Sequence, residues 1–364
     1  MRRAIFLMLS PLMAVLLAGC ATMSSDASQA LRPDPQSEIF STYLAARFAA
    51  GEHDLPQAAR YYGKALAEDP GNPSLLTLSF FYAVTSGDFE AAGKYAQSTV
   101  AAAPDERSAR LTLAVMSLKR KDYAEARKQL SLSAKGPFSV LTLSLFDAWA
   151  AAAQRDETGM QRDLQALLEQ TGTESMAAFH TALLQEYLGK ADAADAAYKK
   201  ALGAGAVSPR VLEAYGRFLE RNGRAEEAGK LYRSHIGDGG LTSIILPGLT
   251  RIAAREKPES LIRNPADGAA ETLFGIAASL TDGQSADVSI LYLRMALYLR
   301  PDLGLAQVLL ADRFETLRKF DTAIEIYRAI EPSSPYYRMA QVQAALDLQR
   351  LGKNSEAIAS LKKL

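Results

Sequence analysis

Residues of one type recur at a fixed interval along most of this chain, and this regularity constrains the fold more than any other feature. The interval is 34 residues, and it separates Pro70 from Pro104, Ala194 from Ala228, Tyr198 from Tyr232, Pro301 from Pro335, and Ala323 from Ala357. A repeat of this length is typical of stacked copies of one small unit, each of which contacts mainly its neighbours. The sequence therefore predicts an elongated array of repeated units.

Each copy of the unit contains two amphipathic helical patterns joined by a short polar turn. The turns recur in phase at 86–92, 120–126, 188–194, 222–228, 318–323 and 351–357. The first pattern ends with glycine or a basic residue, and the second begins near an acid. These residues suit the negative and positive ends of helix dipoles, so the unit is predicted to be helix–turn–helix.

Small residues recur at two positions of the unit when six units start at 39, 73, 107, 141, 175 and 209. The eighth position reads Ala46, Phe80, Ala114, Ala148, Ala182 and Gly216, and the twentieth reads Ala58, Ala92, Ala126, Met160, Ala194 and Ala228. The pattern resembles the tetratricopeptide repeat family, in which the two helices cross at these positions and a bulky side chain would push them apart. Phe80 and Met160 depart from it.

The resemblance implies an all-α fold, a right-handed superhelix (α-solenoid) of about nine helix–turn–helix units. Residues 39–242 are predicted to form six repeats, and residues 243–269, which contain three prolines, an irregular connector. A new phase starting at 270 predicts a second array of three repeats over 270–364, the last incomplete. Because Leu361 and Leu364 would be partly uncovered, we expect a longer array, or alternatively a frayed last helix.

The amino terminus has the features of a lipoprotein signal peptide. Arg2 and Arg3 precede an apolar run, and Leu17-Ala18-Gly19-Cys20 resembles the lipobox of bacterial lipoproteins. That resemblance implies removal of residues 1–19, diacylglycerol on the Cys20 thiol, and acylation of the new amine in many bacteria. The alternative is an ordinary secretory signal. Ala21 favours the outer membrane, facing the periplasm, and residues 20–38 are expected to form a flexible tether.

The composition indicates no catalytic or nucleic-acid-binding chemistry. Lys plus Arg equals Asp plus Glu, 41 each, so the chain lacks the excess positive charge that phosphate backbones attract. His53, His180 and His235 have no second ligand at metal-binding spacing, so we expect no zinc site. Since no phosphate-loop or hydrolase motif occurs either, the sequence predicts no enzyme, no cofactor other than the lipid, and no small-molecule substrate.

A partner-binding groove is implied by the resemblance, since the first helix of each unit lines the concave face of such arrays. Its predicted residues are Tyr43, Arg47, Phe81, Val84, Leu111, Val115, Leu118, Leu145, Trp149, Phe179, Leu183, Arg210, Arg217 and Arg221. Trp149, the sole tryptophan, is the expected anchor for an apolar segment of a protein partner. Two alternatives remain open: these residues pack between repeats, or the chain's own 243–269 segment fills the groove.

These features together predict a membrane-anchored periplasmic scaffold that binds protein partners in envelope assembly. A second hypothesis is an accessory subunit of envelope polysaccharide synthesis or export. A third is the non-catalytic amino-terminal part of a larger envelope enzyme. The repeats themselves predict only protein binding.

Overall fold

The computed structural model describes residues 35–136, 139–168, 172–204, 208–237, 242–280 and 285–364, and the predicted signal peptide and Cys20 lie outside these ranges. The described residues form nineteen α-helices and no strand. The first six hairpins are α1 (Pro35–Gly51) with α2 (Leu55–Glu68), α3 (Pro73–Ser86) with α4 (Phe89–Ala102), α5 (Arg107–Lys119) with α6 (Tyr123–Ser131), α7 (Ser139–Ala153) with α8 (Glu157–Leu168), α9 (Glu174–Tyr187) with α10 (Ala191–Gly203), and α11 (Pro209–Arg221) with α12 (Ala225–Arg233).

Three further hairpins follow a single helix, α13 (Thr242–Ala254). They are α14 (Pro265–Ser279) with α15 (Ala286–Leu299), α16 (Gly304–Thr316) with α17 (Phe320–Arg328), and α18 (Tyr337–Arg350) with α19 (Asn354–Leu361). We call α1–α12 the first array and α14–α19 the second array. The predicted all-α fold of about nine helical hairpins is confirmed.

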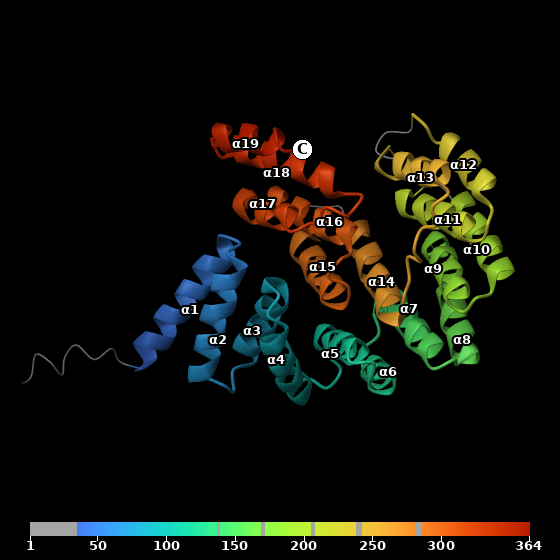
Figure 1. Ribbon diagram of the computed structural model, residues 1–364. Coiled ribbons are helices and arrows are strands. Elements are labelled where there is room, and N and C mark those ends of the chain that lie inside the picture. The colour runs from blue at the N-terminus through green and yellow to red at the C-terminus, as the bar shows by residue number, and fades with distance from the viewer. Residues whose placement is uncertain (1–34, 137–138, 169–171, 205–207, 238–241, 281–284) are drawn as a thin grey trace, which may run out of the picture.

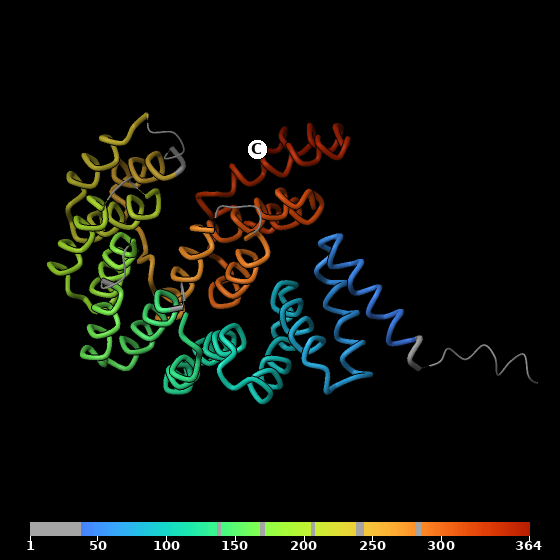
Figure 2. Tube along the Cα trace, turned by 180° about the vertical axis from the view of Figure 1, so that it is seen from behind, coloured from blue at the N-terminus to red at the C-terminus, as the bar shows by residue number. Residues whose placement is uncertain are grey.

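The second array lies inside the curve of the first. The first array runs as an arc, and the second array turns back into its interior (Figure 1). The view from behind shows the same arrangement (Figure 2). Helix α14 packs against α7 and α9, while α15 packs against α3 and α5. The concave side of the first array is therefore covered by the chain's own later helices.

Eight of the turns that the structure describes between paired helices share one local structure. A residue with positive φ precedes the second helix at His53, Gly87, Lys121, Arg155, Gly189, Gly223, Arg318 and Gly352. In the first four hairpins an aspartate follows it, and its side chain accepts a hydrogen bond from a backbone N–H in the first turn of the second helix. These aspartates are Asp54, Asp88, Asp122 and Asp156, with N···O distances of 2.9–3.2 Å. Each satisfies an N–H group that a helix start otherwise leaves unpaired.

We expect Asp88→Ala to lower the free energy of unfolding by about 1 kcal/mol, because it removes the acceptor for the N–H of Ala91 at 3.0 Å. Asp88→Asn keeps an accepting oxygen and should change stability by less than about 0.5 kcal/mol. Urea unfolding followed by circular dichroism measures both. Equal losses from the two variants would show that the charge, not the cap, stabilises this turn.

The small residues of the repeat lie where the two helices of a hairpin cross. Twelve alanines at the eighth and twentieth positions have no exposed surface: Ala46, Ala58, Ala92, Ala114, Ala126, Ala148, Ala182, Ala194, Ala228, Ala277, Ala311 and Ala323. The larger Phe80 and Met160 are buried as well. In the sixth hairpin Gly216 faces Tyr232, and a β-carbon on Gly216 would lie 2.2 Å from the Tyr232 hydroxyl oxygen. Close helix approach therefore explains the predicted pattern.

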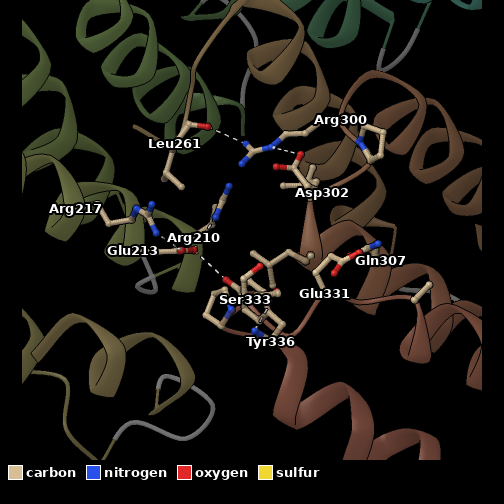
Figure 3. A pocket seen from close by; sticks show the side chains of 17 residues that line it. Arg210, Glu213, Arg217, Leu261, Arg300, Asp302, Gln307, Glu331, Ser333 and Tyr336 are labelled. Carbon is tan, nitrogen blue, oxygen red and sulfur yellow. Dashed lines mark hydrogen bonds and ion pairs between the residues drawn. The ribbon is translucent and has the colours of Figure 1, made fainter. Parts of the chain in front are cut away.

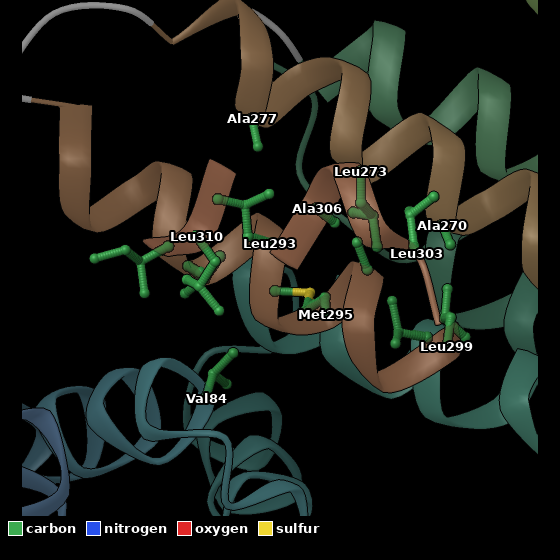
Figure 4. Close-up of a cluster of buried hydrophobic side chains, with 14 of the residues drawn as sticks. Val84, Ala270, Leu273, Ala277, Leu293, Met295, Leu299, Leu303, Ala306 and Leu310 are labelled. Atoms are coloured by element: carbon green, nitrogen blue, oxygen red, sulfur yellow. The ribbon is translucent and has the colours of Figure 1, made fainter. Parts of the chain in front are cut away.

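The two arrays share one hydrophobic core. A single cluster of buried side chains includes Val84 and Val115 of the first array and Leu273, Met295 and Leu310 of the second. Figure 4 shows Val84 of α3 pointing toward α15, which carries Leu293 and Met295. Because the same core contains side chains from both, the second array is part of one folded body with the first.

The predicted irregular connector, residues 243–269, is largely helical. It contains most of α13 and the first turn of α14. Pro247 lies inside α13, and Pro265 lies in the first turn of α14. A first-turn proline costs the helix no hydrogen bond, because the N–H it lacks has no partner within the helix. The irregular part is confined to the residues between α13 and α14.

Candidate functional site

The groove predicted on the first array is not an open surface. Trp149 has no exposed surface, and eight other predicted groove residues are also buried: Val84, Leu111, Val115, Leu118, Leu145, Phe179, Leu183 and Arg210. Tyr43, Phe81, Arg217 and Arg221 are partly buried, and Arg47 is exposed. A partner cannot reach most of this set in this conformation, so the expectation that they form an accessible groove needs correction.

Helix α14 covers Trp149 directly. A β-carbon added to Gly268 would lie 2.2 Å from two atoms of the Trp149 ring system, so only glycine allows this approach. The Trp149 Nε1–H donates a hydrogen bond to Nδ1 of His180 at 3.3 Å. The structure therefore agrees best with the alternative in which the chain fills its own groove. The covering residues belong to α14 and α15, and so extend beyond residues 243–269.

Helix α15 covers the earlier part of the same face. The Arg294 Nε–H donates to the Thr85 carbonyl at 3.0 Å, and the Lys119 ammonium donates to the Leu299 carbonyl at 2.9 Å. The Phe89 and Tyr298 rings stack with their centroids 4.1 Å apart. Apolar contacts and charge-assisted hydrogen bonds therefore both hold the second array against the first.

His180, which accepts the hydrogen bond from Trp149, is buried, and its titration therefore reports on the packing around Trp149. Burial lowers the pKa of His180 to about 3. The unfolded state therefore takes up this proton near pH 6.5, while the folded state stays neutral to about pH 3. The contribution of neutral His180 to the free energy of unfolding is fully present above pH 6.5. It is lost progressively as the pH falls from 6.5 toward 3.

We expect the free energy of unfolding to fall by about 1.4 kcal/mol per pH unit, from this group alone, as pH decreases below 6.5. Comparing urea unfolding of the natural protein and His180→Asn across this range isolates the contribution, since other titrating groups are common to both. Parallel pH profiles of the two proteins would contradict the assignment of a buried neutral imidazole.

A network of buried charges joins α11 to the second array (Figure 3). The Arg210 guanidinium contacts Glu271 of α14 through two nitrogens, one at 3.0 Å from Oε2, and it donates to Glu213 at 2.6 Å. The Tyr336 hydroxyl donates to Glu213 at 2.9 Å. Burial alone would lower the pKa of Arg210, but the charges of Glu271 and Glu213 raise it well above its ordinary value. Each charge therefore depends on its partners to remain buried.

A cavity of about 530 Å³ adjoins this network. It lies between α11, the turn before α16 and the turn between α17 and α18, and Figure 3 shows its lining. Arg210, Arg217 and Arg300 face three acidic residues, Glu213, Asp302 and Glu331. Since opposite charges are equal in number, the cavity favours neither anions nor cations strongly, and it has room for a polar side chain of a partner.

Arg217 is an arginine of this cavity whose hydrogen-bonding groups are only partly used. One of its terminal nitrogens donates to the Glu259 carbonyl at 2.9 Å, and the other lies 3.7 Å from Glu213. Its Nε–H has no hydrogen-bond partner among the described residues. Burial accordingly lowers the pKa of Arg217. The terminal nitrogen that lies 3.7 Å from Glu213, and not the buried Nε–H, has hydrogen-bonding capacity left for a group that enters the cavity.

An exposed apolar face on α18 was not identified from the sequence. Met339, Val342 and Leu346 are 37%, 38% and 40% exposed and lie on one side of the helix. They occupy the second, fifth and ninth positions of the unit that starts at 338, the same positions used to predict the groove on the first array. The register alone could have found them.

The described residues contain no cluster of three His, Cys, Asp or Glu side chains able to hold a metal ion. None of the helices in the described ranges is both long enough and apolar enough to cross a bilayer.

A protein-family model matches two parts of the chain. Residues 82–139 and 179–240 match the tetratricopeptide repeat family model. These matches support the tetratricopeptide repeat family. The predicted fold, a tetratricopeptide-repeat superhelix, agrees with them, and proteins of this kind mediate protein–protein interaction and scaffolding.

Three solved structures align with most of the chain at low sequence identity and low TM-score, and one of them is a tetratricopeptide-repeat domain. The P58(IPK) domain is 14% identical, with 89% of this chain and 92% of that chain covered and a TM-score of 0.27. Yeast Tom70 is 14% identical, with 91% and 92% covered and a TM-score of 0.25. The Naa15/Naa10 structure with HypK-THB bound is 16% identical, with 89% and 57% covered and a TM-score of 0.32. No curated protein matches the chain.

Proposed function

We propose that this protein is a lipid-anchored scaffold of the bacterial cell envelope. The sequence Leu17-Ala18-Gly19-Cys20 supports the anchor, because it follows a basic and then an apolar segment of signal-peptide length. In this proposal residues 1–19 are removed and Cys20 carries diacylglycerol on its sulfur. Ala21 supports attachment to the outer membrane, with the array in the periplasm. The mechanism is binding alone, without a catalytic step.

The surface that carries this proposal is the apolar face of α18 together with the adjoining cavity. The concave side of the first array is covered by α14 and α15, so it offers little area to a partner. Met339, Val342 and Leu346 instead expose a row of apolar side chains on one face of a helix. Such a row suits the apolar side of a helix or an extended segment of a protein partner.

The anchor is tested by labelling cells with a radioactive or clickable fatty acid. Cys20→Ser should abolish both the label and the removal of residues 1–19, because the thiol is the acylated group. A Cys20→Ser protein that is still labelled and processed would refute the lipid anchor.

The binding surface is tested by crosslinking in intact cells. Val342→Glu combined with Leu346→Glu should remove the partner that co-purifies with the natural protein, because buried charges at an apolar interface are costly. The matched control is Ile236→Glu, which alters a side chain 63% exposed elsewhere in the molecule. Equal recovery of the partner from both variants would show that it binds another surface.

A further inference from the structure

The first helix presents an apolar face to solvent. Phe40, Leu44 and Phe48 are 62%, 49% and 73% exposed, and their spacing of four residues places them along one side of α1. The buried Ala46 and Ala49 lie on the other side, toward α2. Two exposed phenylalanines on one helix face of a folded protein indicate a contact surface.

The equivalent positions of the second hairpin show why this face is open. Leu78 and Tyr82 lie 34 residues after Leu44 and Phe48, and both are partly buried. The Tyr82 ring stacks on Tyr62 of the first hairpin, with the centroids 5.1 Å apart. Each hairpin is thus covered by its predecessor, whereas α1 begins the described array and lies at its edge (Figure 1).

The position of the anchor indicates what covers this face. Cys20 precedes Pro35, the first residue of α1, by 15 residues, and an extended segment of that length spans about 50 Å at most. A lipid on Cys20 therefore holds α1 near the bilayer, at a high effective concentration relative to the headgroups. Exposed Arg47 and Gly51 lie on the same side of the helix as the apolar side chains.

We propose that the outer face of α1 lies on the bilayer surface, with Phe40, Leu44 and Phe48 inserted among the lipid headgroups. This inference rests on the proposed lipid anchor. Amphipathic helices bind membranes in this way, through apolar side chains at the boundary between headgroups and acyl chains. The acyl chains supply the attachment, and the α1 face fixes the orientation of the array relative to the membrane.

The experiment uses a new cysteine as the single free thiol of the lipidated full-length protein. Gly51→Cys places a fluorophore at the end of α1 and leaves Phe40, Leu44 and Phe48 unchanged. The position has room for the new side chain, since nothing lies within 4 Å of a β-carbon there. Gly203→Cys is the matched control: Gly203 is also an exposed last residue of a helix, α10, and also has nothing within 4 Å. Both labelled proteins are reconstituted in phosphatidylethanolamine and phosphatidylglycerol vesicles with and without brominated acyl chains.

The proposal predicts that brominated lipid quenches most of the emission from position 51 and little of that from position 203. Adding Phe40→Glu and Phe48→Glu should abolish the quenching at 51 while the protein still floats with the vesicles. If brominated lipid does not quench the label at position 51 in vesicle-bound protein, the inference is overturned. This holds both when iodide in the buffer quenches the label, which shows that water covers the α1 face, and when iodide does not, which shows that residues 21–34 or a second copy of the chain cover it. Failure of the anchor itself is distinct: the unsubstituted protein would not float, and its Cys20 thiol would react with the fluorophore.

Discussion

Glu271→Ala is expected to lower the free energy of unfolding by about 3–5 kcal/mol, because it leaves the Arg210 guanidinium buried without its main counter-charge. The side chains of Arg210 and Glu271 are 10% and 1% exposed, so little water solvates the pair. The contact also joins α11 to α14, and its loss should weaken the docking of the second array. Urea unfolding followed by circular dichroism measures the change.

Two further variants make this prediction specific to the buried pair. Glu226→Ala removes an exposed carboxylate paired with Lys230 and should leave the free energy of unfolding nearly unchanged. Arg210→Met combined with Glu213→Gln and Glu271→Leu removes all three charges of the cluster, so that neither carboxylate is left buried without Arg210, and it should be less destabilising than Glu271→Ala alone. A loss from Glu271→Ala as small as that from Glu226→Ala would contradict the buried contact between Arg210 and Glu271.

Trp149→Ala is expected to cost a similar amount, about 3–5 kcal/mol, because it leaves a cavity where the largest fully buried side chain now lies. Ile236→Ala, at an exposed position, should change the free energy of unfolding by less than about 0.5 kcal/mol. Comparing Trp149→Ala with Ile236→Ala separates the effect of removing a buried side chain from the effect of removing an exposed apolar one. Equal effects of the two substitutions would place Trp149 at the surface.

A double-mutant cycle assigns the Trp149 effect to the contact with α14. Gly268→Ala should destabilise the natural protein by about 1–3 kcal/mol, since its β-carbon would overlap the Trp149 ring. In the Trp149→Ala background the same substitution has room and should cost much less. Additive effects would show that the two residues are not in contact.

The repeat architecture could be predicted from the sequence because its causes are local and recur. The spacing of 34 residues, the turn aspartates and the small residues at the helix crossings each act within one hairpin or between neighbours. Any one occurrence is weak evidence, but the constant phase of many occurrences fixes the helix pairs.

The return of the second array into the first could not be predicted in the same way. The contacts of Trp149 with Gly268 and of Arg210 with Glu271 join positions far apart in the chain, and no periodicity links them. Apolar side chains on a concave face are equally suited to a partner and to the chain's own helix. The sequence is compatible with both alternatives, and only the packing of α14 and α15 distinguishes them.

One signal for this arrangement is present in α14 itself. Seven consecutive residues, 267–273, are buried, and the helix is rich in small and apolar residues on all sides. A helix without a polar face is typical of an element enclosed by others. Reading α14 in this way would have moved the candidate surface from the first array to α18.

Fluorescence of Trp149 tests most directly whether the second array covers the concave side of the first. The chain has one tryptophan, so its emission reports this site alone. We predict blue-shifted emission that resists acrylamide quenching until the protein unfolds, and partial loss of this protection in Gly268→Ala. Emission typical of hydrated tryptophan, quenched by acrylamide in the native protein as readily as in the unfolded one, would contradict the account.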